Sequence, residues 1–272
     1  MMFLDQILAS RRARLAKEQA ARPLALLQKA AEARADHRDF AGRLAKPGLQ
    51  VIAELKQASP SRGVLRAAYD PRKIARDFEA AGAAALSVLT EPDFFKGSLE
   101  NLGAAREAVT LPVLRKDFII DPYQVYEAAA AGADAVLLIV AGLGQQELIR
   151  LHALAASLGL AALVEVHTAE ELERAVGAGA GLIGVNNRNL HTFEVALETS
   201  LKLKSRIPAG ALSVSESGIR TAQDLEQLQQ AGFNAVLIGE RFMTAADPGQ
   251  ALGELLAGLH RAPASAGEKL RA

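Results

Sequence analysis

The sequence predicts one (β/α)8 barrel, and three observations support this prediction. Short apolar runs alternate with helical patterns eight times from residue 50 onward, and strict alternation closes as a barrel more readily than it forms an open sheet. An Ala-Gly pair precedes every second run, with the glycines at positions 82, 132, 179 and 232, which is the spacing of two strand–helix units. The four runs between these pairs end in acidic or basic side chains.

The N-terminal segment, residues 1–48, is expected to form a helical extension that packs on the barrel. Residues 5–21 favour a helix on the outside of the domain, with aliphatic side chains on one side and basic ones mostly on the other. The aliphatic residues are Ile7, Leu8 and Leu15, and the basic residues are Arg11, Arg12, Arg14 and Lys17. A second helix is expected over residues 24–35, and Pro47 with Gly48 marks the turn into the first strand.

The barrel is assigned to residues 49–260, and residues 261–272 to a polar tail. Strands are expected within residues 51–56, 86–89, 111–118, 136–140, 162–167, 182–185, 212–217 and 236–238. Helices are expected over residues 71–81, 98–109, 122–131, 145–158, 169–176, 197–205 and 221–231, and the repeated glycines end helices just before buried strands. A doubly wound sheet is the alternative, but it would place a Gly-x-Gly-x-x-Gly turn after the first strand, and none follows Lys56.

Composition and charge exclude several classes of protein. Of the 272 residues 50% are hydrophobic, and 31 basic residues balance 31 acidic ones, so no net field attracts nucleic acid or an anionic membrane. The absence of cysteine excludes disulfides, thiolate nucleophiles and cysteine-based zinc sites, and it fits a cytoplasmic location. No apolar run approaches the roughly 18 residues of a membrane span. Asp5 and Glu18 interrupt the arginine-rich start, which we interpret as part of the mature protein rather than a targeting segment.

Polar and charged residues end several predicted strands, where a barrel places its active site. These candidates are Glu54, Lys56, Lys116, Glu165, Asn186, Glu216 and Ser217. Glu54 and Lys56 are two residues apart, so they point to the same face and can hold each other ionised. Lys116 ends an apolar run and is the candidate acid, because a buried charge is costly unless it is paired or used. The alternative is an ion-pair layer that plugs the top of the barrel.

A phosphate site is predicted after the last two strands, where barrels often bind phosphate through backbone amides. Gly218 follows Ser217 after the seventh strand, and Gly239 precedes Glu240 after the eighth. Glycine lets the backbone approach the phosphate oxygens. Because Glu240 adds a carboxylate, only its backbone is assigned to phosphate, and Ser59 is expected to add a hydroxyl. The alternative for each glycine is a simple turn.

Aromatic residues predict a slot for a flat apolar ring beside these groups. Phe94 and Phe95 lie in the polar loop after the second strand, and Phe118 follows the third. Together they can form the walls of a pocket, although a core contact for one of them is the alternative. No two histidines have the spacing of metal ligands, so no metal is assigned, and His167 near the mouth is given no role.

Taken in order, these motifs resemble the indole-3-glycerol-phosphate synthase family of tryptophan biosynthesis. The resemblance runs from the N-terminal helix to about residue 243 and involves seven motifs on seven strands. The matching segments are residues 53–61, 89–98, 114–118, 163–165, 184–190, 215–219 and 237–240.

The resemblance implies ring closure of 1-(2-carboxyphenylamino)-1-deoxyribulose 5-phosphate to indole-3-glycerol phosphate, with loss of carbon dioxide and water and with no cofactor. Lys116 would protonate the sugar ketone as a general acid. Glu165 would stabilise the developing positive charge and accept a proton as the ring becomes aromatic. Lys56, oriented by Glu54, would contact the substrate carboxylate and supply the proton that expels water.

The same resemblance implies which residues hold the substrate. Its hydroxyls and the two lysines would be held by Asn186, Glu216 and Ser217. Its aromatic ring would lie against Phe95, Phe118, Leu190 and Ile219, with Arg188 near the carboxylate. The N-terminal helix would cover this mouth. The phosphorylated substrate is the only partner implied, and the sequence leaves open whether the chain is a monomer or associates with other enzymes of the pathway.

Three other functions are considered. An aldolase would use Lys56 or Lys116 as a Schiff base in a sugar-phosphate barrel. The isomerase that precedes the synthase in the pathway shares its fold and substrate type, but that family relies on a cysteine base and this chain has none. A non-enzymatic phosphate-binding barrel would not need two lysines and three carboxylates at one mouth.

Overall fold

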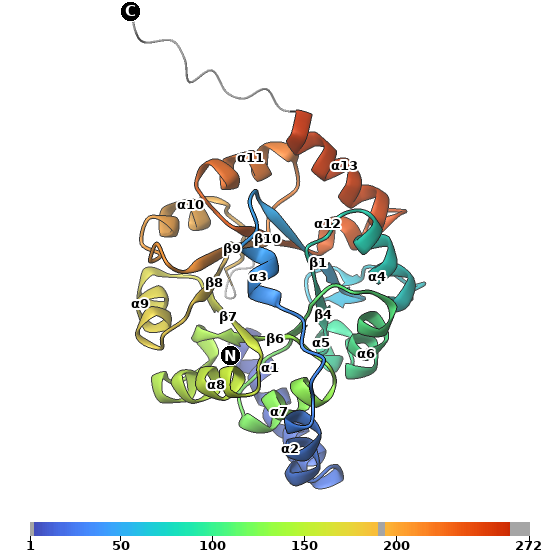
Figure 1. Cartoon of the computed structure of the whole chain (residues 1–272), viewed down its shortest axis with the longest axis vertical. Helices are drawn as coiled ribbons and strands as arrows, with labels where there is room; N and C mark the ends of the chain where they lie inside the picture. The colour runs from blue at the N-terminus through green and yellow to red at the C-terminus, as the bar shows by residue number, and fades with distance from the viewer. Residues whose placement is uncertain (1–2, 190–193, 262–272) are drawn as a thin grey trace, which may run out of the picture.

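The computed structural model describes residues 3–189 and 194–261 and contains a closed barrel of eight parallel strands. Strands follow one another around the barrel in chain order, and the first pairs with both the second and the last (Figure 1). The strands are β1 (Gln50–Leu55), β4 (Ala85–Leu89), β5 (Val113–Lys116), β6 (Ala135–Ile139), β7 (Ala161–Val166), β8 (Leu182–Asn186), β9 (Leu212–Glu216) and β10 (Ala235–Ile238). The predicted fold class is therefore confirmed.

Helices surround the barrel and cover the outer face of its strands (Figure 1). They are α4 (Pro71–Ala80), α6 (Leu99–Ala108), α7 (Pro122–Ala130), α8 (Gln145–Ser157), α9 (Ala169–Gly177), α10 (Glu198–Lys204), α11 (Ala222–Gln230) and α13 (Pro248–Arg261). Side chains of Asp70, Asp121 and Thr168 cap three of their N-termini by accepting backbone N–H groups. The four repeated glycines have φ angles of 96°, 93°, 80° and 86°, which confirms that they end helices in the left-handed conformation.

Several short elements were not predicted. They are α3 (Phe40–Leu44), the antiparallel pair β2 (Ala58–Ser59) and β3 (Gly63–Val64), α5 (Pro92–Phe95), the 3₁₀ turn η1 (Val140–Gly142) and α12 (Glu240–Met243). The segment expected to be a loop after the second strand thus contains α5. The Glu91 carboxylate stabilises the start of this helix, because it accepts three backbone N–H groups from the first turn.

The barrel interior is apolar at one end and charged at the other. Inward side chains from the lower strand positions, such as Ile52, Leu114 and Leu163, form a continuous buried cluster with Phe40 and Leu44 of α3. Helix α3 therefore closes the end of the barrel where the strands begin (Figure 1). The opposite end, where the strands finish, is left for polar groups.

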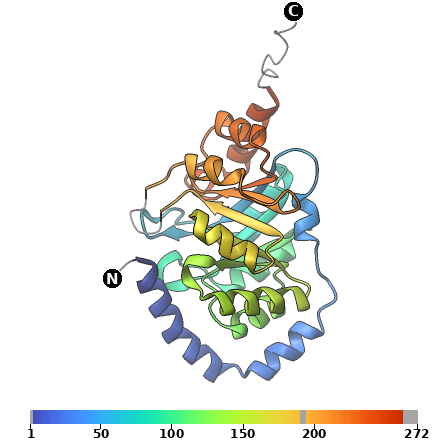
Figure 2. The ribbon, with the colours of Figure 1, turned by 90° about the vertical axis from the view of Figure 1, so that its left-hand side faces the viewer.

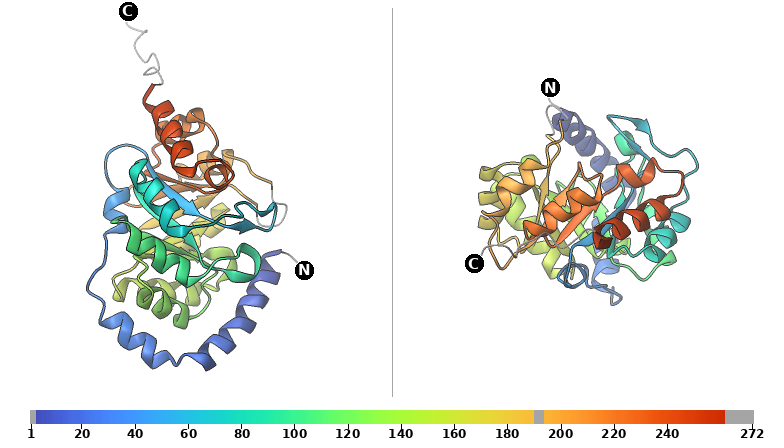
Figure 3. Two further views of the ribbon diagram at one scale, coloured as in Figure 1. Left: turned by 90° about the vertical axis from the view of Figure 1, so that its right-hand side faces the viewer. Right: turned by 90° about the horizontal axis from the view of Figure 1, so that it is seen from above.

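The N-terminal extension consists of α1 (Phe3–Ala21) and α2 (Leu24–Glu32), which lie along one side of the barrel (Figures 2 and 3). Tyr123 of α7 donates its hydroxyl to the carbonyls of Glu18 and Arg22, both at 3.1 Å. Arg11, which the helical pattern placed among the basic outer residues, is instead buried with 2% exposure and pairs with Glu18 at 2.7 Å. Burial is tolerated because that pairing compensates the charge.

A buried ionic cluster ties the chain after α2 to the barrel wall. The Asp134 carboxylate, with 0% side-chain exposure, lies 2.6 Å from both Arg34 and Arg106. It also accepts the backbone N–H groups of Val113 at 2.9 Å and Arg38 at 3.0 Å. Arg34 belongs to this cluster and lies outside the helix, because α2 ends at Glu32 rather than at the predicted residue 35. Within the two described ranges, no helix is long and apolar enough to cross a membrane.

Replacing Asp134 with Ala should lower the free energy of unfolding by about 3–5 kcal/mol, because two buried guanidinium groups would lose their buried counter-ion and keep only the exposed carboxylate of Asp36. Urea unfolding followed by circular dichroism measures this loss. Glu173→Ala is the matched control, because its partner Arg206 is exposed and such pairs contribute less than about 1 kcal/mol. Equal effects of the two variants would contradict the assignment.

Candidate active site

A cavity of about 510 Å³ opens at the end of the barrel where the strands finish. It brings together Glu54, Lys56, Phe95, Lys116, Phe118, Glu165, Asn186, Arg188, Glu216, Ser217, Gly218, Ile219, Gly239 and Glu240. A smaller adjoining cavity of about 80 Å³ contains Ser59 and is also lined by Phe3, Leu4 and Ile7 of α1. Leu190 lies outside the described residues. The side chains singled out in the sequence therefore lie in two connected cavities at one mouth.

Lys116 lies between two carboxylates at the bottom of the larger cavity. Its Nζ is 3.1 Å from Glu165 Oε2 and 3.3 Å from Glu216 Oε2, and its side chain is only 14% exposed. Burial by itself lowers the pKa of Lys116, but Glu165, Glu216 and Glu54 outweigh burial and raise this pKa above its ordinary value. The ammonium form is therefore strongly favoured before substrate binds.

Glu165 and Glu216 have opposite pKa shifts although both are buried. Burial raises the pKa of Glu165, but Lys116 and His167 overcome burial and lower it. Burial raises the pKa of Glu216 to about 8, with Lys116 opposing and Glu165 and Glu54 adding to the rise. Two carboxylates of different basicity thus face one ammonium, an arrangement suited to acid–base chemistry.

Two glycines make room for these carboxylates. A Cβ at position 184 would lie 2.3 Å from Glu216 Oε1, and a Cβ at position 239 would lie 2.2 Å from Glu54 Oε1. Any side chain at Gly184 or Gly239 would push the carboxylates out of the cluster. Glu54 in turn holds Lys56 at 2.6 Å, as the two-residue spacing along β1 predicts.

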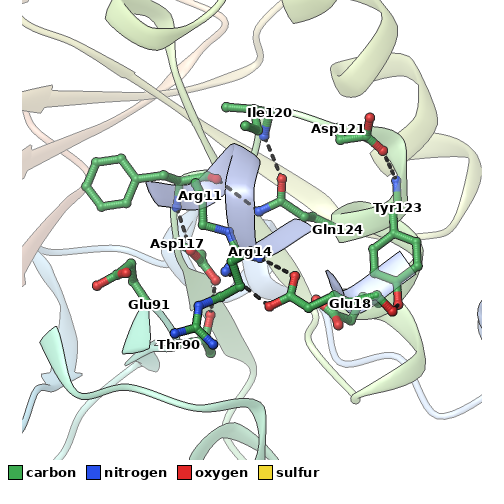
Figure 4. A network of polar contacts seen from close by, with 12 residues as sticks. Arg11, Arg14, Glu18, Thr90, Glu91, Asp117, Ile120, Asp121, Tyr123 and Gln124 are labelled. Atoms are coloured by element: carbon green, nitrogen blue, oxygen red, sulfur yellow. Dashed lines mark hydrogen bonds and ion pairs between the residues drawn. The ribbon is translucent and has the colours of Figure 1, made fainter. Parts of the chain in front are cut away.

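Strand alternation separates Lys116 from its charged neighbours. Arg115 is buried behind β5, where it pairs with Asp117 at 3.0 Å and Glu127 at 2.8 Å. Thr90 donates its hydroxyl to Asp117 at 2.5 Å, and this network lies beneath α1 (Figure 4). Of the three consecutive charges, Arg115 and Asp117 thus anchor the strand end while Lys116 reaches the buried carboxylates.

The predicted aromatic slot is formed by two of the three phenylalanines. The rings of Phe95 and Phe118 are 6.1 Å apart, and both line the cavity. The Phe94 ring instead packs edge-on against Phe3 at 5.5 Å and so joins α5 to α1. Ser10 also donates to Asp93 at 2.7 Å, so α1 is attached beside the slot.

The loops after β9 and β10 form the far side of the cavity. Ser217 and Gly218 have consecutive φ angles of 66° and 79°, and a Cβ at position 218 would lie 2.5 Å from Val195. Gly218 lines the cavity in this left-handed conformation, which glycine adopts without strain. The Glu240 carboxylate is paired with Arg62 at 3.0 Å and Arg188 at 3.4 Å.

Sequence reasoning missed several residues of the site. Arg62, Arg220 and Arg241 line the larger cavity, and His167 lies 3.6 Å from Glu165. Arg62 follows Ser59 closely and Arg220 follows Gly218, so their positions beside predicted phosphate loops were a usable signal. Among the side chains that the structure describes, no group of three or more histidine, cysteine or acidic residues could hold a metal ion.

One family of known proteins matches nearly the whole chain. The family model for indole-3-glycerol phosphate synthase matches residues 4–255. The chain belongs to this family. Synthases of this name from Laribacter hongkongensis and Acidithiobacillus ferrooxidans are 50% and 52% identical to it, covering 94% and 93% of the chain and 99% and 98% of the relatives.

Solved structures of more distant proteins show the same fold. The 3-hexulose-6-phosphate synthase of Salmonella typhimurium aligns with a TM-score of 0.61 at 14% identity over 77% of this chain and 99% of that one. A thiamine phosphate pyrophosphorylase from Pyrococcus furiosus aligns with a TM-score of 0.58 at 18% identity, over 78% and 96% of the two chains. These likenesses show the barrel fold alone, because one fold can carry many unrelated functions.

Replacing Glu216 with Gln should stabilise this synthase at alkaline pH. Because the folded pKa of about 8 exceeds the ordinary 4.5, the wild-type carboxyl favours folding below pH 4.5 and this contribution is lost as pH rises to about 8. The two proteins should melt at similar temperatures near about pH 5, and the variant should melt a few degrees higher near about pH 9, at about 2–4 °C per kcal/mol.

Calorimetry across this pH range measures the difference. The exposed Glu32→Gln variant is the control and should follow the wild type at every pH. A constant offset between E216Q and wild type would show that the Glu216 pKa is not raised.

Proposed function

We propose that this chain converts 1-(2-carboxyphenylamino)-1-deoxyribulose 5-phosphate to indole-3-glycerol phosphate, releasing carbon dioxide and water. The observation that best supports this is the position of Lys116, a buried ammonium between two carboxylates. An aromatic slot lies on one side of it and the glycine turns lie on the other. A substrate with a flat ring at one end and a phosphate at the other fits that order of groups.

Lys116 acts as the general acid that protonates the sugar ketone while the aromatic ring carbon attacks it. Its raised pKa keeps a proton available at neutral pH. Burial next to Glu165 and Glu216 keeps water from competing for that proton. The same pKa direction argues against Lys116 as the Schiff-base lysine of an aldolase, because imine formation needs the free amine.

Glu165 stabilises the positive charge that develops on the substrate nitrogen and then accepts a proton as the new ring becomes aromatic. Its lowered pKa keeps it ionised before the reaction. Lys56, held at 2.6 Å by Glu54, contacts the aromatic carboxylate and protonates the leaving hydroxyl. Each of these proton transfers contributes a factor of about 10² to 10⁴.

The remaining side chains of the mouth position the substrate. Asn186, Glu216 and Ser217 hold its hydroxyls and the lysines. Its ring lies against Phe95, Phe118, Leu190 and Ile219, with Arg188 near the carboxylate. Its phosphate is bound by backbone N–H groups at Gly218, Gly239 and Glu240 and by the Ser59 hydroxyl. The glycine turns and the arginines around them support this orientation.

The domain assignment is proposed in the same terms. Residues 49–260 supply the chemistry, α1 within the extension of residues 1–48 covers one side of the mouth, and residues 261–272 form a polar tail to which no chemistry is assigned. Phe3, Leu4 and Ile7 in the wall of the smaller cavity support the covering role. The phosphorylated substrate is the only partner needed, no cofactor or nucleic acid takes part, and the balanced charge and absence of cysteine support a cytoplasmic location.

Lys116→Met should reduce kcat by about 10² to 10⁴ while the substrate still binds, because the general acid is lost and the pocket is kept. The assay follows indole fluorescence with purified protein and substrate, without metal or cofactor, and binding is measured by calorimetry. Lys202→Met on the exposed face of α10 is the control and should turn over normally.

Near-normal turnover by K116M would remove Lys116 from the proposed role. Borohydride treatment in the presence of substrate adds an independent check. A covalent adduct at Lys56 or Lys116 would indicate an imine and would favour the aldolase over the synthase.

A further inference from the structure

His167 lies behind Glu165, next to the catalytic pair but outside the cavity wall. Its Nε2 is 3.6 Å from Glu165 Oε1, whereas Lys116 approaches the other oxygen, Oε2, at 3.1 Å. This ring nitrogen is buried and has no hydrogen-bond partner among the described residues. Glu165 is therefore contacted by a substrate-facing ammonium on one oxygen and by an imidazole on the other.

Glu171 connects this imidazole to the surface. Its Oε2 lies 3.2 Å from His167 Nδ1 and accepts the backbone N–H of His167 at 2.7 Å. Side-chain exposure rises from 2% at Glu165 to 12% at His167 and 17% at Glu171. Glu171, His167 and Glu165 thus lie in a row from α9 to the cavity, with one gap of 3.6 Å between His167 Nε2 and Glu165 Oε1.

The proposed reaction requires a proton from solvent in every turnover, and this part of the argument depends on that reaction. One proton is added to the ketone oxygen as the carbon–carbon bond forms, and a second is added to the leaving hydroxyl. One proton is removed when the ring becomes aromatic. The carboxylate leaves as carbon dioxide and its electron pair stays in the ring, so the net consumption is one proton per product.

We propose that His167 relays this proton between solvent and the Glu165–Lys116 pair while substrate fills the mouth. Protonated His167 passes the proton from Nε2 to Glu165, Glu165 passes it to Lys116, and Nδ1 is resupplied through Glu171. His167 touches no reacting atom and acts through Glu165, so it is a positioning and relay residue.

The surrounding charges favour the protonated form of His167. Burial lowers the pKa of His167, but Glu171 on α9, Glu165 on β7 and Glu216 on β9 together raise it above the ordinary value. Lys116 contacts the other oxygen of Glu165, with its Nζ 3.1 Å from Oε2. Proton delivery should therefore fall as pH rises through the pKa of His167.

Comparison of His167→Gln with wild type in single-turnover and steady-state assays tests the relay. A single turnover uses protons that the site already holds and needs none from solvent, so the first product should form at the wild-type rate. Steady-state kcat in dilute buffer should fall by up to about a hundredfold, and added imidazole or concentrated buffer should restore it. His152→Gln on α8 is the matched control and should show neither effect.

Glu171→Gln provides a second test, because glutamine keeps a side-chain oxygen that can accept the backbone N–H of His167. Loss of this carboxylate lowers the pKa of His167, so the fall of kcat at high pH should begin at a lower pH than in wild type. An unmoved pH profile overturns the relay, as does an H167Q variant with unchanged kcat or with equal loss in both assays and no response to imidazole. Absence of product from wild type would instead overturn the proposed function.

Discussion

The structure depends on a constraint at the mouth of the barrel, where one lysine and two glutamates are buried together. An ammonium removed from water is tolerated only where carboxylates compensate it, and two carboxylates at one ammonium cannot both be equally ionised. Lys116 therefore stays charged, Glu165 is held as its partner, and Glu216 is left with a raised pKa. The cluster holds acid and base in contact before substrate arrives.

The rest of the barrel keeps this cluster in place. Helix α3 closes the other end with Phe40 and Leu44, so the interior is apolar below the charged layer. Gly184 and Gly239 leave the space that the carboxylates occupy. Arg115 anchors the end of β5 from behind, and this fixes the direction in which Lys116 points.

Much of the fold was predictable because its signals are local. Alternation of apolar runs with helical patterns, and glycines in the left-handed conformation at helix ends, depend on neighbouring residues alone. The errors occurred at two kinds of position, one decided by a distant packing partner and one by a single capping side chain. Arg11 looked like a surface residue until α1 was packed against the barrel, and α5 forms because Glu91 caps a segment that composition marks as a loop.

The sequence by itself determined the eight strand–helix units and which charged residues stand at strand ends, since both follow from periodicity along the chain. Only the tertiary structure decided which of those residues contact one another and which of the carboxyl groups has a raised or a lowered pKa. Closure of the barrel brings β5, β7 and β9 together, so Lys116 meets Glu165 and Glu216 although 49 and 100 positions separate them. Burial and distance then set which carboxyl is acidic and which is not, and they place His167 behind Glu165. The electrostatic energy of two charges depends on the distance between them in the folded protein and not on their separation along the chain. The pairing of Lys116 with Glu165 and Glu216 could therefore be seen only in the folded structure.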